Sequence, residues 1–298
     1  MTVRFVVCHD TFFDAPTGHQ TRAAPIAARS RHRYTAQEPM RGMSDVTREA
    51  QTTTDAVSGG ALEIIQHEGG YRFGLDSLLL ATDLPDLGEG ACVVDIGAAQ
   101  GTVGLCIANR HPTWQIRCVE RQPQLAELLR TNISHNALQE RVDALEADVR
   151  DYREHLDAHS ADLVVCNPPY YRRGQRRPSE DAERASAHHE LHGELRDFVA
   201  AAAYVAKQRG WFKVIVPPVR LADLFAAVAE TDLSLHSMRY FHSRSGDDAY
   251  LLEALMRRGG SPDPRVRSPL YIYRNADDYS EEVDSRIRRA ALPPTRTS

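Results

Sequence analysis

The sequence predicts an α/β fold, a doubly wound and mostly parallel sheet with helices on both faces. Short apolar runs recur along the chain and alternate with segments whose apolar residues have helical spacing. An acidic residue or an Asn-Pro-Pro turn stands at the end of several of these runs. Parallel strands need helical crossovers and are covered on both faces, so they read as continuous apolar runs. The alternation therefore indicates a parallel sheet with polar groups along one edge.

The two ends of the chain are predicted to lie outside the folded domain. Residues 1–55 mix arginine with Thr, Ala, Gln and Pro, and no apolar period persists there. We expect a disordered leader in this segment, and Met43 is an alternative start of the protein. A single domain is expected over residues 56–285, followed by a flexible tail at 286–298.

The domain is expected to begin with two short strands and a helix. Residues 61–66 are predicted as the first strand, Gly69 and Gly70 as a turn, and residues 71–73 as the second strand. Asp76 occupies the position expected of a helix cap, ahead of the apolar run that follows it.

Strands and helices then alternate through the rest of the domain. The predicted strands are residues 91–96, 115–120, 142–148, 162–166 and 211–216. The predicted helices between them are residues 103–109, 123–136 and 195–208. Two further strands, at residues 233–236 and 250–255, would complete the sheet.

Composition excludes some classes of protein. The chain has 42% hydrophobic residues, and no apolar run approaches the roughly 18 residues of a membrane span. The apolar stretch at the N-terminus is too short for a signal peptide, so a cytoplasmic protein is expected. The five cysteines form no C-x-x-C pair, and His188 and His189 are adjacent on a predicted helix and point in different directions, so no metal site is expected. Because the net charge is −5, nucleic acid must be bound by a local basic patch.

Three acidic residues follow the predicted strands, where ligands bind in open parallel sheets. They are Asp95, Glu120 and Asp148. A glycine-bearing turn at 95–101 joins the first of these strands to its helix, and such a turn lets backbone approach a ligand. A carboxylate at Glu120 can bind both hydroxyls of a ribose. The pattern predicts a nucleoside cofactor, and nucleotide-binding dehydrogenases share it.

The turn resembles that of the class I, Rossmann-like methyltransferases, whose pattern is Asp-x-Gly-x-Gly-x-Gly. The resemblance implies S-adenosylmethionine as the cofactor. It also implies that Gly97 and Gly101 wrap the methionine moiety, that Glu120 holds the ribose and that Asp148 contacts the adenine amino group. Ala99 replaces the middle glycine, at a cost of roughly 1 kcal/mol if the position needs a positive φ. Asp95 and Asn167 complete the predicted cofactor site.

The Asn-Pro-Pro-Tyr turn at residues 167–170 is predicted to be catalytic. An exocyclic amine on a base is a poor nucleophile because its lone pair is delocalised. The Asn167 side-chain oxygen and the Pro168 carbonyl can both accept hydrogen bonds from the amine and aim its lone pair at a methyl donor. Tyr170 offers a ring on which a planar base can stack, typically worth about 1–3 kcal/mol. The turn is similar to the loop of amino-methyltransferases acting on adenine, cytosine, guanine or glutamine amides.

Segments flanking this turn resemble the bacterial tRNA1(Val) (adenine-N6)-methyltransferase family. They comprise residues 70–81, 216–221 and 269–273 together with Asn132, Asn136 and Tyr279, and the resemblance spans roughly residues 60–282. It implies methyl transfer to N6 of an adenine in tRNA, in the anticodon region. It also implies that residues 71–76 lie over the cofactor pocket, although for Arg72 and Asp76 an apolar lid helix with a cap is an equal alternative.

The segment after the turn is predicted to contact RNA. Its arginines and tyrosine suit phosphate contacts and base stacking, and they are Tyr171, Arg172, Arg173, Arg176 and Arg177. A tRNA substrate and a monomer are favoured. Two alternatives stay open: methylation of a glutamine amide at N5 in a protein such as a release factor, and a non-catalytic RNA-binding protein of the same fold.

Overall fold

The computed structural model describes residues 52–68, 72–169, 194–261, 263–275 and 278–293 of the 298-residue chain. These residues form a nine-stranded mixed sheet and a separate two-stranded hairpin of β1 (Thr52–Val57) and β2 (Leu62–His67). Among them there is no helix with the length and hydropathy of a membrane span.

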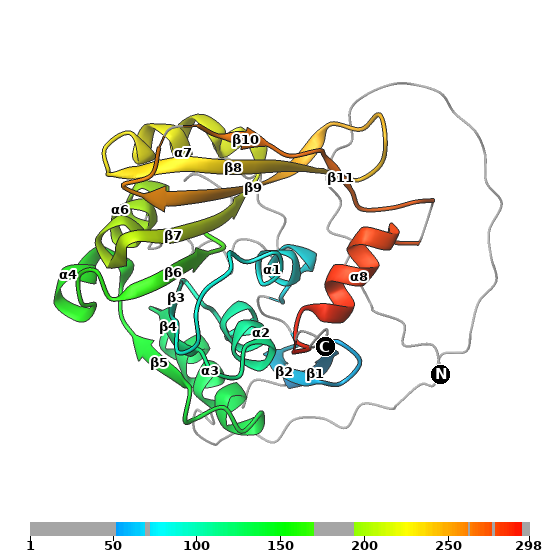
Figure 1. The fold of residues 1–298 in the computed structure, drawn as a ribbon. Coiled ribbons are helices and arrows are strands. Elements are labelled where there is room, and N and C mark those ends of the chain that lie inside the picture. The colour runs from blue at the N-terminus through cyan, green and yellow to red at the C-terminus, as the bar shows by residue number, and fades with distance from the viewer. Residues whose placement is uncertain (1–51, 69–71, 170–193, 262, 276–277, 294–298) are drawn as a thin grey trace, which may run out of the picture. The chain divides into compact units, whose positions relative to one another are not determined.

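The large sheet has five parallel strands at its centre and one edge. In sequence order these are β3 (Cys92–Ile96), β4 (Gln115–Glu120), β5 (Val142–Glu146), β6 (Ala161–Cys166) and β7 (Ala206–Val216). The other strands are β8 (Leu233–His242), β9 (Ala249–Arg258), β10 (Arg265–Val266) and β11 (Leu270–Tyr271). Figure 1 shows the order β10-β8-β9-β7-β6-β3-β4-β5, in which β9 is antiparallel to both neighbours. The predicted doubly wound, mostly parallel sheet is confirmed.

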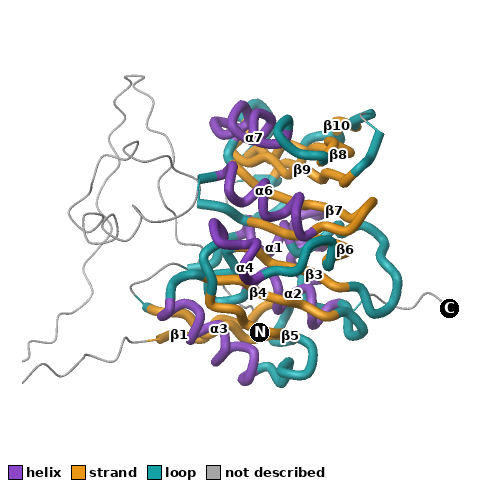
Figure 2. Tube along the Cα trace, turned by 90° about the vertical axis from the view of Figure 1, so that its left-hand side faces the viewer, coloured by secondary structure: helices purple, strands orange, loops and turns teal. Residues whose placement is uncertain are grey.

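Helices cover both faces of this sheet. One face carries α1 (Leu75–Leu80), α2 (Thr102–Arg110), α3 (Pro123–His135) and α8 (Glu281–Arg289), together with the hairpin. The other carries α6 (Leu195–Val205) and α7 (Leu221–Val228), with the short turns η1 (Val149–Asp151) and α4 (Tyr152–His155). In Figure 2, α4 and α6 lie on the near side of the strands and α1 and α2 on the far side. One 3₁₀ turn, η2 (Pro218–Arg220), precedes α7.

The apolar runs in the sequence follow from this double covering. Val93 and Val94 are neighbours on β3, and their side chains pack into the clusters on opposite faces of the sheet. Both are at most 5% exposed. Successive side chains of a strand point to opposite faces, so a strand covered on both sides must be apolar throughout.

The hairpin differs from the prediction. β2 pairs with β1 in the register Val57↔Leu62, whereas Arg72 and Phe73 form no strand and Tyr71 lies outside the described residues. The turn between the strands has positive φ at Ser58, Gly59 and Gly60, which glycine adopts at little cost. The described structure therefore begins with a strand at Thr52, inside the segment predicted as leader, and residues 1–51 lie outside the described part.

The C-terminal boundary also differs. Residues 286–298 were expected to be a flexible tail, but α8 continues to Arg289, and Arg286 is only 1% exposed. The Ser58 hydroxyl donates to the Ile287 carbonyl at 3.0 Å and accepts from the Ala291 backbone N–H at 2.9 Å. The end of α8 is held because it packs against the β1–β2 turn, a contact between residues more than 200 positions apart.

Candidate functional site

The predicted site residues meet at one edge of the sheet. β4 lies between β3 and β5, and β6 lies on the other side of β3. In the registers, Ile96 is level with both Val119 and Cys166. The strand ends that carry Asp95, Glu120, Asp148 and Asn167 are therefore adjacent. Carboxyl ends of parallel strands are where such sheets bind ligands.

The glycine turn after β3 needs its unusual backbone. Gly97 has φ +77°, Ala99 φ +49° and Gly101 φ +96°. A Cβ on Gly101 would lie 2.4 Å from Leu129 Cδ1, so the conformation favours glycine and a larger residue would also force the Leu129 side chain to shift. Ala99 does occupy the left-handed region, so the expected strain of about 1 kcal/mol applies.

Glu120 joins the end of β4 to this turn. Its Oε2 accepts from the Ala99 backbone N–H at 2.9 Å, and its Oε1 accepts from that of Gln122 at 2.8 Å. The residue is 6% exposed, and burial raises the pKa of its carboxyl group. A carboxylate has about four acceptor directions, so each oxygen can still accept one hydroxyl. This capacity fits a ribose.

Asp95 lies inside the protein rather than along the open edge. It is 1% exposed, and its Oδ2 accepts from the Gly104 backbone N–H at 2.9 Å in the first turn of α2. Burial, with a further contribution from Glu120, raises the pKa of Asp95 to about 7. A Cβ on Gly104 would lie 2.4 Å from Cys118 Sγ. Asp95 therefore fixes α2 closely against β3 and supports the turn from behind.

Asp148 is held by an arginine. Its Oδ1 accepts from the Arg150 Nε at 2.9 Å, and its Oδ2 accepts from Nη2 at 2.6 Å. The hydrogen bond from the Arg150 side chain is the main cause that lowers the pKa of Asp148. Oδ1 also accepts from the Arg150 backbone N–H at 3.0 Å, so it is Oδ2 that keeps acceptor capacity through which an amino group can share the carboxylate with Arg150.

Two polar residues beside Gly101 were missed by the sequence reasoning. Gln100 and Thr102 are 1% and 3% exposed. Gln100 Oε1 and Thr102 Oγ1 are buried and have no hydrogen-bond partner among the described residues. Buried polar atoms normally have a partner, so these two fit a polar ligand at the turn. The only sequence signal for them is their position within a glycine turn.

The hairpin is connected to the glycine turn through amide side chains. Gln66 on β2 accepts from the Gln100 Nε2 at 3.3 Å and donates to Asp55 on β1. Asn132 on α3, which is fully buried, donates to the carbonyls of Ile65 and Gln100 at 2.9 Å each. These hydrogen bonds connect the β1–β2 hairpin to the glycine turn and restrict its movement.

Arg72 is placed by the same hairpin. Its guanidinium forms an ion pair with Asp55 and donates to the Thr53 hydroxyl at 2.8 Å. The structure thus gives Arg72 two contacts with β1, the strand that the sequence analysis placed mostly in the leader.

Asn167 is oriented by α1. Its Nδ2 donates to the Asp76 Oδ2 at 2.9 Å and lies 3.5 Å from the Ser77 Oγ. The predicted cap at Asp76 is wrong, because α1 begins at Leu75 with Gly74 as its N-cap, and Asp76 lies in the first turn. An ionised carboxylate only accepts, so the amide nitrogen must face Asp76. The sequence reasoning considered Asp76 but did not include it among the site residues.

The orientation leaves the amide oxygen of Asn167 available. Oδ1 is buried and has no hydrogen-bond partner among the described residues. Pro168, the next residue, is buried, and Pro169 is exposed. The arrangement presents one preoriented acceptor at the end of β6, ready to receive an N–H donor.

The rest of the predicted catalytic and RNA-contacting segment lies outside the described residues. This applies to Tyr170, Tyr171, Arg172, Arg173, Arg176 and Arg177. Within the part of the chain that is described, no three His, Cys, Asp or Glu side chains are grouped as metal ligands.

Comparisons with known proteins show which family and fold the chain is similar to. Residues 70–211 match the family model of the methyltransferase small domain. A tRNA1(Val) (adenine(37)-N6)-methyltransferase of Aeromonas hydrophila is 28% identical over 211 residues, which cover 70% of this chain and 86% of the relative. An enzyme of the same name from a Flavobacteriaceae bacterium is 30% identical over 152 residues, covering 51% of this chain and 62% of the relative.

A solved structure supports the fold. A predicted O-methyltransferase from Agrobacterium tumefaciens superposes with a TM-score of 0.58 and 22% identity, over 75% of this chain and all of that one. The sheet order, the glycine turn and the family match lead to one assignment. Over residues 70–211 the chain is similar to the methyltransferase small domain, and the cofactor of such methyltransferases is S-adenosylmethionine.

Proposed function

We propose that the protein transfers a methyl group from S-adenosylmethionine to the exocyclic N6 of an adenine in tRNA, in the anticodon region. The observation that carries this proposal is the orientation of the Asn167 amide. Asp76 holds its nitrogen, and the buried oxygen is left without a partner among the described residues. A group that must receive a substrate amine needs this arrangement.

The residues act by positioning the amine. Asn167 Oδ1 accepts one N–H of the amine, and the carbonyl of Pro168 accepts the other. The two hydrogen bonds localise the nitrogen lone pair and fix its direction, so most of the rate enhancement comes from orientation and preorganised dipoles. When bound, S-adenosylmethionine supplies an electrophilic methyl group on its sulfonium. Tyr170 is proposed to stack on the base.

The cofactor is proposed to lie along the strand ends. Gly97 and Gly101 would approach the methionine moiety, and Gln100 and Thr102 offer it polar atoms. The remaining acceptor capacity of Glu120 suits the two ribose hydroxyls. Asp148 would accept from the adenine amino group of the cofactor, in addition to Arg150.

Adenine in tRNA is favoured over other amines by the relatives. Both curated relatives described above are named as methyltransferases of adenine N6 at position 37 of tRNA1(Val). A base in an exposed loop needs little extrusion, whereas a base in a duplex must be flipped out at a cost of a few kcal/mol. The arginines and Tyr171 after the catalytic turn are proposed to contact the same RNA.

The test compares two substrates. Purified protein is incubated with labelled S-adenosylmethionine and either tRNA from a strain that lacks its own enzyme or a release factor, and the products are digested and analysed. We expect N6-methyladenosine in the tRNA digest. Label only on a glutamine of the release factor, or on neither substrate, would refute the proposal. The N167A variant should lose turnover while calorimetry shows cofactor binding close to wild type.

A further inference from the structure

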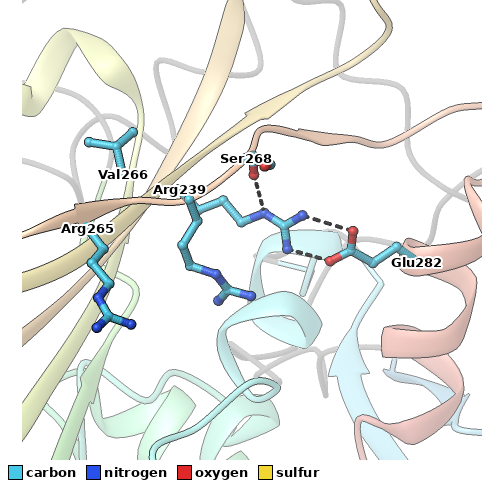
Figure 3. Close-up of a pocket in the computed structure, with 6 residues that line it drawn as sticks. Arg239, Arg265, Val266, Ser268 and Glu282 are labelled. Carbon is cyan, nitrogen blue, oxygen red and sulfur yellow. Dashed lines mark hydrogen bonds and ion pairs between the residues drawn. The ribbon is translucent and has the colours of Figure 1, made fainter.

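A pocket lined with arginines lies away from the methyl-transfer site. It has a volume of about 460 Å³ and lies between β8, the segment that begins with β10, and α8 (Figure 3). We call it the arginine pocket, and its lining residues are Arg239, Arg265, Val266, Arg267, Ser268 and Glu282.

Arg239 builds the frame of this pocket. It is 5% exposed, and its Nε donates to the Ser268 carbonyl at 2.9 Å. Its two terminal nitrogens donate to the two carboxylate oxygens of Glu282, as Figure 3 shows. A bidentate arginine–carboxylate pair has fixed geometry. Arg239 therefore locks the start of α8 and the segment after β10 to the sheet, and its charge is balanced locally.

Arg265 and Arg267 supply the positive charge that is open to solvent. Both are exposed, and as alternate residues of an extended segment they point to the same side, opposite to Val266. Arg267 lies 3.5 Å from the Asp83 carboxylate, in a partly exposed pair of the kind that contributes little stability. Arg265 forms no ion pair with any described residue. Both guanidinium groups can therefore turn towards an anionic ligand.

The surroundings of the pocket have an excess of positive charge. Among the described residues, the charged lining residues and the ion pairs that connect to them comprise five cations and three anions, a net charge of 5 − 3 = +2. The cations are Lys213, Arg239, Arg265, Arg267 and Arg286, and the anions are Asp83, Glu253 and Glu282. The chain as a whole carries −5, so this excess is local.

The effect of that field is visible on Asp83. Burial alone would raise the pKa of its carboxyl group, yet Arg286, Lys213 and the neighbouring arginines hold it below its ordinary value. The same positive charge that stabilises the ionised form of Asp83 also attracts an anionic ligand from solvent.

The sheet register relates the pocket to the methyl-transfer site. Cys166 on β6 is level with Val214, so Asn167 is level with Ile215. Ile215 pairs with Glu253, which pairs with Arg239. Three strand spacings of about 4.8 Å separate the two positions, or roughly 14 Å. An RNA whose base occupies the methyl-transfer site has to extend by this distance for its backbone phosphates to reach the pocket.

We propose that the arginine pocket binds phosphate groups of the RNA backbone, at a distance from the base that occupies the methyl-transfer site. This rests on the proposed function, because it takes tRNA as the substrate. Guanidinium groups match the geometry of phosphate oxygens, and contacts with the backbone set affinity and register without reading the sequence. Arg265 and Arg267 make the contacts, and the Arg239–Glu282 pair holds the segment that carries them.

The test removes the charges of Arg265 and Arg267 and compares this variant with one in which two other exposed arginines are removed. R265A/R267A is compared with R117A/R130A, whose arginines also form exposed ion pairs but lie beside β4 and β5, at the opposite end of the sheet. Both variants change the net charge equally. Binding of fluorescently labelled tRNA is measured by anisotropy without cofactor, at several salt concentrations, and circular dichroism checks the fold.

We expect R265A/R267A to bind tRNA about 10-fold more weakly. The slope of log affinity against log salt concentration should become shallower by roughly 0.7–0.9 for each phosphate that the variant no longer neutralises. R117A/R130A should stay within about 2-fold of wild type. Equal weakening in both variants would show a general effect of net charge and overturn the proposal, and so would unchanged binding in R265A/R267A.

Two further measurements separate this proposal from others. Calorimetry with inorganic phosphate tests for a small-anion site: stoichiometric binding of phosphate, with tRNA affinity unaffected by R265A/R267A, would overturn the assignment to RNA. Because binding is measured without cofactor, weak tRNA binding by R265A/R267A supports the pocket even if the wild-type protein forms no N6-methyladenosine. In that case only the proposed function fails.

Discussion

The contact between Asp76 and Asn167 gives the most discriminating test of the mechanism. In the D76A variant, only the long 3.5 Å contact with the Ser77 Oγ still draws the amide nitrogen of Asn167 towards α1, and the side chain can rotate so that its nitrogen faces the substrate amine. Two donors then face each other, and no hydrogen bond forms. We therefore propose that Asp76 is a positioning residue that acts through Asn167.

The size of the effect follows from the 2.9 Å hydrogen bond between the Asn167 Nδ2 and the Asp76 Oδ2. A hydrogen bond to a charged group contributes about 1.5–3 kcal/mol, and 1.4 kcal/mol corresponds to a factor of ten. We expect kcat of D76A to fall about 10- to 100-fold. The Kd for the cofactor should stay within about 2-fold, since Asp76 contacts the catalytic amide and not the glycine turn.

A double-mutant cycle decides whether Asp76 acts through Asn167. In an N167A background, D76A should cause no further loss of kcat, because the group that it orients is already gone. D76N keeps one acceptor oxygen and should recover part of the activity. D86A, which removes an exposed acid in the segment after α1, is the control with the same change in charge. Additive losses in D76A/N167A, or a loss in D86A as large as that in D76A, would refute the positioning role.

Two further predictions concern the glycine turn and its support. In the wild type, the pKa of Asp95 is raised to about 7 in the folded state, so between about pH 4 and 7 the native state binds more protons than the unfolded state. The free energy of unfolding of the wild type therefore falls as pH rises through this range. The D95N variant lacks this titration, so its stability relative to wild type should increase over the same range. Urea unfolding between pH 5 and 8 measures the difference, which should level off above pH 7; a constant difference would contradict the raised pKa. The A99G variant should be more stable by about 1 kcal/mol, because Ala99 has φ +49° and glycine removes that strain. No gain in the urea midpoint would show that the turn relaxes without cost.

The parallel core of the sheet was predictable because its signal is local. β4 has the predicted bounds, and β6 begins one residue before them, since a strand buried on both faces must be apolar throughout and its ends are marked by polar residues. β7 was less predictable: it begins at Ala206, inside the helix expected to extend to Gln208. Ala206 continues the helical spacing of apolar residues in the segment before it, so the sequence is compatible with a helix or a strand at this position. Its pairing with Ala161 on β6 makes it part of the strand.

The hairpin and the end of α8 were not predictable in this way. Thr52–Val57 is polar and short, and it becomes a strand because β2 pairs with it and β2 in turn packs against α2 and α3. Arg286 looks like part of a charged tail, yet it is buried because Glu253 and Asp83 surround its guanidinium. Contacts between such distant positions produce no periodic pattern of apolar residues in the sequence around either of them.

For the site, the sequence alone determined which chemistry is present: acidic residues at successive strand ends, a glycine turn, and an asparagine before two prolines. These residue types are fixed by what a ligand or an amine requires, so they are visible without a fold. Only the tertiary structure decided how they are used. In the folded protein, the Asp95 carboxylate accepts a hydrogen bond from the backbone of α2, and Asp76 contacts Asn167 although it lies 91 positions away in the sequence. The amide oxygen of Asn167 is left buried without a partner among the described residues. Orientation of a side chain depends on neighbours that only folding brings together.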